Sequence, residues 1–296
     1  MDKTMKKEEV LHRLLLIREM EHKIEKLFQE GKLRGTTHCC IGQEAVPVAL
    51  SWLIDIEKDY LCSGHRAHGL SMMMTMKPEL LLGEIMGKPW GMAKGLGGSQ
   101  HVYYKHYFTN GITGGMVPVT AGIAFTLKQT PSRDIAVVDF GDGAMNEGYV
   151  LEAFNLAAEM DLPILFILEN NGYAMSTPVQ TVNPYRLFEE RVKGFGLPYA
   201  QVSTSDFDAL YSVLDQSVTY VRENRSPMFV EVITHRFCGH SKSDKREYIP
   251  RQEDQWWRDH DCVESVARQL PETTVSQIRE SVLREVDAIC DYCLSN

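Results

Sequence analysis

Two polar loops, each following an apolar run, carry residue types that bind divalent cations and phosphates. The first loop holds Gly141-Asp142-Gly143, and the second holds Asn170-Asn171. Carboxylate and amide oxygens are ligands that Mg²⁺ accepts, commonly together with phosphate oxygens of a bound molecule. If both loops lie at the carboxyl edge of one parallel sheet, they would form a site for such a cation and a diphosphate.

The chain between the two loops has the pattern of a βαβ unit. Residues 135–140 and 164–169 are short runs dominated by apolar and β-branched side chains, which is typical of buried strands. Between them, apolar residues recur at helical spacing from 149 to 160. The start of that helix would direct unpaired N–H groups toward a ligand above Gly143.

Two other interpretations of the glycine motif are open at this point. An ordinary βαβ unit could use the same Asp and Asn residues to cap turns and helices. A nicotinamide-binding fingerprint fits less well, because its third glycine position is Asn146. The acid that should follow roughly 20 residues later is also misplaced, since the next strand ends at Glu169. The double asparagine downstream favours the cation and diphosphate site.

Composition limits the class of protein. The 296 residues are 44% hydrophobic and carry a formal net charge of −9, which argues against a general nucleic-acid binder. No apolar run approaches the roughly 20 residues of a membrane span, and no secretion signal is visible. Seven cysteines without framework spacing indicate a reduced, cytoplasmic compartment, and Cys290 and Cys293 indicate one packed helix face rather than a zinc site.

The remaining elements alternate between strand and helix patterns. We expect a single domain over 1–296 in the α/β class, with a mainly parallel sheet flanked by helices. The glycine-rich segment 87–122 also contains several aromatic residues, so we expect ordered loops rather than a flexible linker. The expected helices are 7–29, 43–53, 78–86, 117–128 and 206–222 with a helical tail over about 262–296, and the expected further strands are 199–203 and 228–234.

Seven motifs in order make the chain resemble one enzyme family, the alpha subunit of the thiamine-diphosphate-dependent 2-oxoacid dehydrogenase decarboxylating component. That family includes the pyruvate, branched-chain and acetoin dehydrogenases. The matching segments cover most of the chain, and they support a thiamine-diphosphate-binding domain. They are RGTTHCCIGQEA at 34–45, HRAHG at 65–69, AKGLGGSQH at 93–101, NGITGGMVP at 110–118, GDGAMNEG at 141–148, ENNGYAMST at 169–177 and HRFCGHSKSD at 235–244.

The resemblance implies a role for each residue of a thiamine diphosphate and Mg²⁺ site. Histidine suits proton transfer and carboxylate binding near neutral pH, and a guanidinium suits phosphate. His68 is expected to orient Arg66 or to pack below it. The resemblance implies that Mg²⁺ is bound by Asp142, Asn171 and the Tyr173 carbonyl, and that the diphosphate is bound by Gly143, Ala144 and Arg66. It implies that the aminopyrimidine ring lies against Gly111, Ile112 and Thr113, with further cofactor contacts from His65 and Tyr104. It implies catalysis at the substrate end by His38 and His240, and His240 would also contact the cofactor.

The chain departs from the family pattern near the expected substrate end. His65 stands where tyrosine is usual, Cys238 where histidine is usual, Lys245 where proline is usual, and Thr113 where an aliphatic residue is usual. Ser241 and Ser243 belong to a loop that is phosphorylated in some relatives, and we expect an unmodified loop here. These differences leave the identity of the substrate open.

The family activates the cofactor with a glutamate on a second, pyrimidine-binding domain, for which we find no counterpart in this sequence. We therefore expect a separate beta subunit in an α2β2 assembly, a 2-oxoacid or acetoin substrate, and acyl transfer to a lipoyl acyltransferase. The alternatives are the diphosphate-binding half of a split transketolase-like enzyme, a specialised decarboxylase or carboligase without a lipoyl partner, and a nucleotide-binding or regulatory α/β protein without enzyme activity.

Overall fold

The computed structural model describes residues 5–183, 187–241 and 243–296, and a seven-stranded sheet lies at their centre. The strand order is β2-β3-β1-β4-β5-β9-β8, and every neighbouring pair is parallel except β2 with β3. The predicted α/β class with a mainly parallel sheet is therefore confirmed. The strands are β1 Tyr60–Ser63, β2 Tyr103–Tyr104, β3 Tyr107–Thr109, β4 Ala136–Gly141, β5 Ile164–Asn170, β8 Tyr199–Ser203 and β9 Met228–Ile233, and β6 Tyr173–Ala174 with β7 Thr177–Pro178 form a separate small hairpin.

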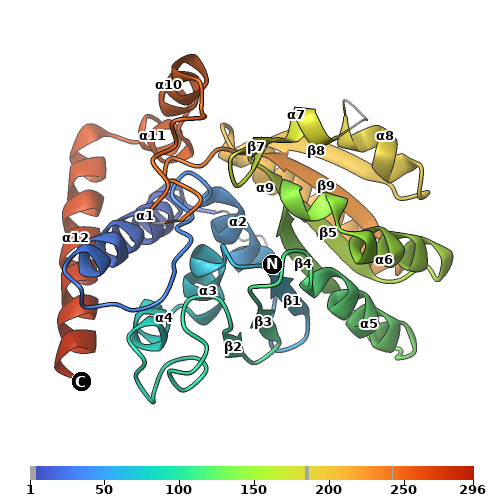
Figure 1. The fold of residues 1–296 in the computed structure, drawn as a ribbon, viewed down its shortest axis with the longest axis horizontal. Coiled ribbons are helices and arrows are strands. Elements are labelled where there is room, and N and C mark those ends of the chain that lie inside the picture. Colours follow the sequence, from blue (N-terminus) through green and yellow to red (C-terminus); the bar gives the residue numbers. More distant parts are fainter. Residues whose placement is uncertain (1–4, 184–186, 242) are drawn as a thin grey trace.

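Helices cover both faces of the sheet, and Figure 1 shows α5 and α6 on one side, with α1, α3, α4 and α12 on the other. Two buried clusters of apolar residues fill the space between the sheet and these two layers. One layer contains α1 Lys7–Gln29, α2 Ala45–Leu53, α3 His68–Thr75, α4 Pro78–Ile85, α9 Phe207–Asn224, α11 Cys262–Ala267 and α12 Glu272–Ser295. The other contains α5 Met116–Lys128, α6 Gly148–Glu159 and α8 Phe188–Lys193, while α7 Val179–Val182 and α10 Arg251–Asp259 are short outer helices.

The central strands are apolar on both faces, as a covered parallel sheet requires. Val137 and Ile167 pack into the cluster below α1, α2 and α9, whereas Val138 and Phe166 pack into the cluster below α5 and α6. This alternation with a period of two fixes which side chains reach each face.

The predicted βαβ unit is present as β4, α6 and β5, but a turn that the sequence pattern did not predict separates β4 from the helix. A 3₁₀ turn, η1 Asp142–Asn146, follows β4, and the α-helix starts at Gly148 because Glu147 is extended, with φ −76° and ψ 129°. The turn therefore supplies the N–H groups above Gly143. A Cβ at Gly143 would lie 2.9 Å from the Cβ of Ala174, so glycine is needed for the close approach of β6.

The connections after β1 and β4 leave the sheet on opposite faces. β1 leads to α3 in the first layer, and its neighbour β4 leads to α6 in the second. Such a reversal opens a crevice at the carboxyl ends of the two strands, which is where ligands bind in open α/β sheets. The topology therefore predicts a ligand site beside the segments that follow Ser63 and Gly141.

Glu84 holds the glycine-rich segment in place from the end of α4. Its carboxylate is fully buried and accepts backbone N–H groups from Ala93, Gly95 and Gly97 at 2.6–2.8 Å. The segment is thereby folded back into ordered loops, as its aromatic content predicted. It continues through Gln100 to the crevice described above.

The C-terminal helix α12 packs along α1 at one edge of the molecule (Figure 1). Cys290 and Cys293 are both buried in the core cluster there, which confirms that their spacing marks a packed face. Among the described residues, no helix combines the length and the apolar character that crossing a membrane requires.

Replacing Glu84 with alanine should destabilise the protein by about 3 kcal/mol or more, because three backbone donors would lose a charged acceptor. Urea unfolding of the full chain measures this free energy. Glu223→Ala, at an exposed position of α9, is the matched control and should change stability by less than about 0.5 kcal/mol. Equal unfolding midpoints for the Glu84→Ala variant and the unaltered chain would contradict this role of the carboxylate.

Candidate active site

A cavity of about 390 Å³ lies at the carboxyl ends of β1, β4 and β5, in the crevice that the topology predicts. All residues predicted for the site line this cavity, except Tyr104 and Ile112. The predicted residues that the structure brings together are His38, His65, Arg66, Gly111, Thr113, Asp142, Gly143, Ala144, Asn171, Tyr173 and His240.

The two exceptions lie outside the cavity lining. Tyr104 belongs to the edge strand β2, where it pairs with Tyr107 and packs against the core cluster beneath α1 and α4. Ile112 lies on the same loop as Gly111 but is 62% exposed and does not line the cavity. The cofactor contact expected of the loop at 111–113 stays a prediction.

The Asp142 carboxylate is buried and has one oxygen without a hydrogen-bond partner among the described residues. Asp142 is 2% exposed, and its Oδ2 atom has no hydrogen-bond partner among the described residues. Burial raises the pKa of Asp142 to about 6, although backbone N–H groups at Gly143 and in the Asn171 loop oppose that shift. A buried carboxylate oxygen without a partner is costly unless a cation completes it, so the donor set fits a divalent ion.

The neighbouring amide is oriented for the same task. Asn171 donates its NH₂ group to Gln43 Oε1 at 3.4 Å, and its Oδ1 atom accepts the Tyr173 N–H at 3.3 Å. The amide oxygen therefore lies on the side of the Tyr173 backbone. Gln43 is almost fully buried and also lines the cavity. Its place in the RGTTHCCIGQEA motif is the sequence signal for this residue, which is not among the predicted site residues.

Two arginines line the cavity and differ in how fully they are engaged. Arg66 donates to the Cys39 carbonyl at 2.5 Å and to the His240 carbonyl at 3.2 Å, so it ties together two loops that are distant in sequence. Arg236 is buried and donates to the Met175 carbonyl, but its Nη1 atom has no partner among the described residues. The HRFCGHSKSD motif contains Arg236, but its importance comes from its burial, which the sequence does not show.

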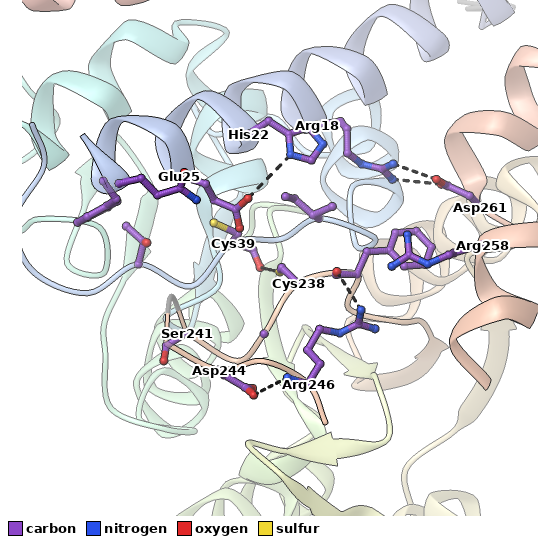
Figure 2. A pocket seen from close by; sticks show the side chains of 16 residues that line it. Arg18, His22, Glu25, Cys39, Cys238, Ser241, Asp244, Arg246, Arg258 and Asp261 are labelled. Atoms are coloured by element: carbon purple, nitrogen blue, oxygen red, sulfur yellow. Dashed lines mark hydrogen bonds and ion pairs between the residues drawn. The ribbon is translucent and has the colours of Figure 1, made fainter. Parts of the chain in front are cut away.

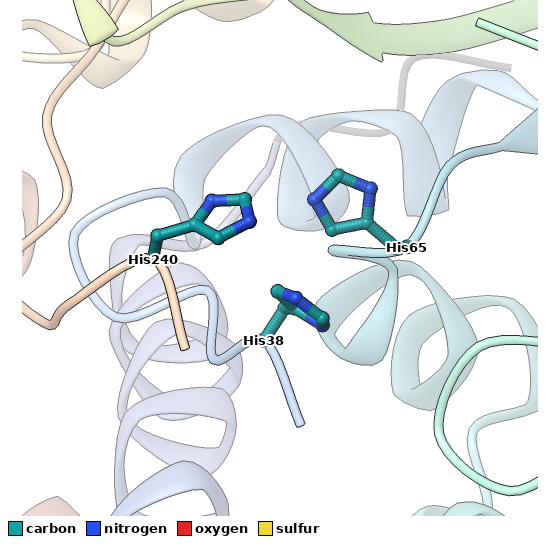
Figure 3. Close-up of side chains that lie close together, drawn as sticks. All are labelled: His38, His65 and His240. Carbon is teal, nitrogen blue, oxygen red and sulfur yellow. The ribbon is translucent and has the colours of Figure 1, made fainter. Parts of the chain in front are cut away.

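Three histidines meet at the other end of the cavity (Figure 3). The ring centroid of His38 lies 4.5 Å from that of His65 and 4.9 Å from that of His240. Burial, with the positive charge of Arg66 and of the neighbouring rings, lowers the pKa of His38 to about 2, of His65 to about 3 and of His240 to about 4. All three are neutral at physiological pH. Gln100 Nε2 lies 3.0 Å from His38 Nδ1 and holds that ring in position.

A buried acidic pair forms the floor of the cavity. Asp139 and Glu169 are each less than a tenth exposed, and Asp139 accepts the Ser63 hydroxyl at 2.8 Å. Burial raises the pKa of Asp139 to about 7, and burial together with the charge of Asp139 raises that of Glu169. The apolar character of 135–140 predicts a buried strand, and Asp139 inside that strand is the signal in the sequence that points to this pair.

His68 packs below the site rather than beside the ligand position. It is fully buried, and its Nδ1 atom lies 2.9 Å from the buried carboxylate of Glu21. Glu21 also accepts the Cys40 N–H at 2.8 Å, which fixes the loop that carries His38. This pair supports the cavity wall from α1.

A larger cavity of about 740 Å³ lies on the far side of the loop that carries His240, against α1 (Figure 2). Its cationic side chains are already neutralised: Arg18 pairs with Asp261 and Glu44, and both Arg246 and Arg258 pair with Asp254. The Cys238 thiol donates to the Cys39 carbonyl in the wall between the two cavities. We therefore place the chemistry in the smaller cavity, where charged groups lack partners.

The family model for the dehydrogenase E1 component matches residues 12–293. The chain belongs to this family, and it is an enzyme subunit of the alpha type. It is 34% identical to the pyruvate dehydrogenase E1 component subunit alpha of Zymomonas mobilis over 96% of this chain and 83% of that protein. It is 36% identical to the corresponding subunit of Rhizobium meliloti, over 93% and 79%, and 35% identical to the testis-specific mitochondrial form of Rattus norvegicus, over 92% and 69%. The enzyme class predicted from the seven motifs is confirmed.

Replacing Asp139 with asparagine should stabilise the protein increasingly as pH rises. The folded carboxyl has a pKa of about 7 against roughly 3.9 when unfolded, so folding retains a proton and the unaltered chain loses stability across this window. The gain from Asp139→Asn between about pH 5 and 8 should exceed about 1.4 kcal/mol, the equivalent of one pKa unit. Urea unfolding at the two pH values measures it, with exposed Asp215→Asn as control. A gain that is equal at both pH values would refute the assignment.

Proposed function

We propose that this chain is the alpha subunit of a thiamine-diphosphate- and Mg²⁺-dependent 2-oxoacid dehydrogenase, with pyruvate or a similar 2-oxoacid as substrate. The observation that carries the proposal is the buried, unpartnered Oδ2 atom of Asp142 beside the oriented Asn171 amide, at the crevice between β1 and β4. The names of the relatives support the substrate class, since each compared protein is called a pyruvate dehydrogenase subunit.

Each end of the cavity suits one part of the ligand set. Asp142, the Asn171 side chain and the Tyr173 carbonyl would hold Mg²⁺, which favours oxygen ligands. The N–H groups of Gly143 and Ala144 and the Arg66 guanidinium would bind the diphosphate. Gly111 and Thr113, with Ile112 on the same loop, would lie along the aminopyrimidine ring. When bound, thiamine diphosphate supplies the electron sink for decarboxylation.

The histidines would act on the substrate. His38 and His240 are neutral at physiological pH, so each can donate a hydrogen bond to a carbonyl or carboxylate oxygen of the substrate. Their lowered pKa values make both rings weak bases in this chain alone. Gln100 fixes the orientation of His38, and the Arg66 contact with the His240 carbonyl fixes the loop that presents His240.

The partner subunit would complete the site from its exposed side. Ile112 and Thr113 are exposed on a loop whose neighbour Gly111 lines the cavity, so this side can be covered by another chain. We propose a beta subunit that carries the pyrimidine-binding domain and the activating glutamate, in an α2β2 assembly that passes the acyl group to a lipoyl acyltransferase. The relatives' designation as alpha subunits supports this partner.

A decarboxylase or carboligase without a lipoyl partner is the second candidate. His65 and Cys238, which depart from the family pattern, lie respectively in the cavity and in its outer wall. Product analysis of the reconstituted enzyme separates the two candidates. Acyl-lipoamide formation supports the dehydrogenase, whereas free aldehyde or acyloin as the sole product supports the alternative.

Asp142→Ala should weaken Mg²⁺-dependent thiamine diphosphate binding by at least about 100-fold, because it removes a buried anionic ligand. Calorimetric titration of the complex with its beta subunit measures the affinity. The control Asp215→Ala removes an exposed acid of α9 and should bind normally. Unchanged affinity in the Asp142→Ala variant would rule out the cofactor assignment.

The purified chain alone should not turn over any 2-oxoacid, because the proposed activating glutamate lies on the partner. Addition of the beta subunit should restore decarboxylation, measured as carbon dioxide release with an artificial electron acceptor. Turnover by this chain as a pure homo-oligomer would contradict the split site.

A further inference from the structure

The three histidines at the substrate end come from separate segments of the chain and converge on one point. His38 precedes α2, His65 follows β1, and His240 follows β9 (Figure 3). One ligand nitrogen from each lies within 4.8 Å of the others. Within the part of the chain that the structure describes, no other group of three His, Cys, Asp or Glu residues is arranged in this way. We propose that this three-histidine cluster binds one first-row transition-metal dication, such as Zn²⁺, separately from the Mg²⁺ position.

The ligand chemistry favours that class of ion. Neutral imidazole is a common ligand of Zn²⁺, and three histidines with an open fourth position form a known type of zinc site. With Zn–N distances of about 2.0–2.1 Å, tetrahedral geometry places ligand nitrogens roughly 3.4 Å apart. Small rotations of the rings would bring the present nitrogens to that spacing. Mg²⁺ prefers oxygen, so it would stay at Asp142.

Groups around the cluster hold two of the rings by one nitrogen. Gln100 Nε2 lies 3.0 Å from Nδ1 of His38, and Arg66 Nη2 lies 3.5 Å from Nδ1 of His240. Both groups donate as they stand, so each Nδ1 atom accepts and the proton of the neutral ring lies on Nε2. Binding of a metal through Nε2 therefore requires that proton to move to Nδ1. Rotation of the Gln100 amide would let its oxygen accept from Nδ1–H of His38, as second-shell partners of metal-bound histidines do, and His240 would give up its 3.5 Å contact with Arg66.

The surrounding charges set how tightly a dication binds. Arg66 and Arg236 line the same cavity and oppose a cation, and Asp139 and Glu169 offset them only in part, because burial raises the pKa of both acids. An anionic fourth ligand, such as hydroxide or a carboxylate, would offset the arginines further. We therefore expect affinity on the order of micromolar rather than the much tighter binding of structural zinc.

His65 is the residue that completes the cluster. It stands where the family pattern has tyrosine, so His65→Tyr keeps an aromatic ring with a hydrogen-bonding group but removes one imidazole. If the proposed function is correct, a metal at the substrate end would also inhibit turnover. That consequence rests on the proposed function, whereas metal binding itself does not.

The test is metal titration of the full chain without an affinity tag, at saturating Mg²⁺. Co²⁺ serves as the probe because its visible absorption reports tetrahedral nitrogen ligation, and Zn²⁺ is then added as a competitor. We expect one Co²⁺ per chain and displacement by Zn²⁺. His65→Tyr and His240→Ala should each weaken binding at least tenfold, and His260→Ala, an exposed histidine of the α10 end, should not.

The outcomes separate this site from the cofactor site. Co²⁺ affinity that His65→Tyr and the smaller variant His65→Gln both leave unchanged would overturn the proposal, as would no binding by the unaltered chain. Circular dichroism confirms that each variant is folded. Asp142→Ala should retain Co²⁺ binding; loss of Co²⁺ binding there would place the metal at Asp142 and overturn the three-histidine site. Retention of thiamine diphosphate affinity in Asp142→Ala would instead overturn the proposed function alone.

Discussion

The burial of charged groups at one edge of a parallel sheet is the constraint on which the rest of this structure depends. Apolar strands β4 and β5 deliver Asp139, Asp142 and Glu169 to the crevice where the helix connections diverge. One carboxylate oxygen of each acid has no hydrogen-bond partner among the described residues, and the same is true of the Nη1 atom of Arg236. Such groups are expensive to bury. The fold tolerates them at the position where a cation and an anionic ligand would satisfy them together.

The loops around the crevice are held by a second set of buried polar contacts that are satisfied. Glu84 fixes the glycine-rich segment through three backbone N–H groups, and Glu21 fixes the His38 loop through Cys40. Arg66 then joins the His38 and His240 loops through their carbonyls. Rigid placement of this kind is what a site needs when its catalytic groups sit on loops. The residues that support the loops have hydrogen-bond partners, whereas several charged residues that line the smaller cavity have polar atoms without one in the described part of the chain. This difference distinguishes the smaller cavity from the larger cavity beside α1.

The sequence predicted the parts of the fold and the site that depend on local pattern. Periodicity placed the βαβ unit and the strands at 199–203 and 228–234, because apolar spacing is set by the elements themselves. Most of the site residues that the motifs predict line one cavity. The sequence pattern could not separate η1 from α6, since the extended Glu147 between them depends on tertiary packing. Nor could it find Asp139 or Arg236, whose importance comes from burial, or show that Tyr104 packs at the sheet edge.

His65 shows how one substitution changes the chemistry of such a site. In the family pattern the position carries a phenol, whereas here an imidazole stands 4.5 Å from the ring of His38 and 5.5 Å from that of His240. The three imidazoles are neutral and lie close together. Protonation of any one ring is unfavourable, because burial and the positive charge of Arg66 lower the pKa of each. The histidine end therefore disfavours a proton on any one ring, and in our proposals its three nitrogens would instead share one metal dication, while Asp142 would hold Mg²⁺ at the other end. The two ends of the cavity differ in ligand chemistry, nitrogen at one end and oxygen at the other, so under the two proposals they would select different ions.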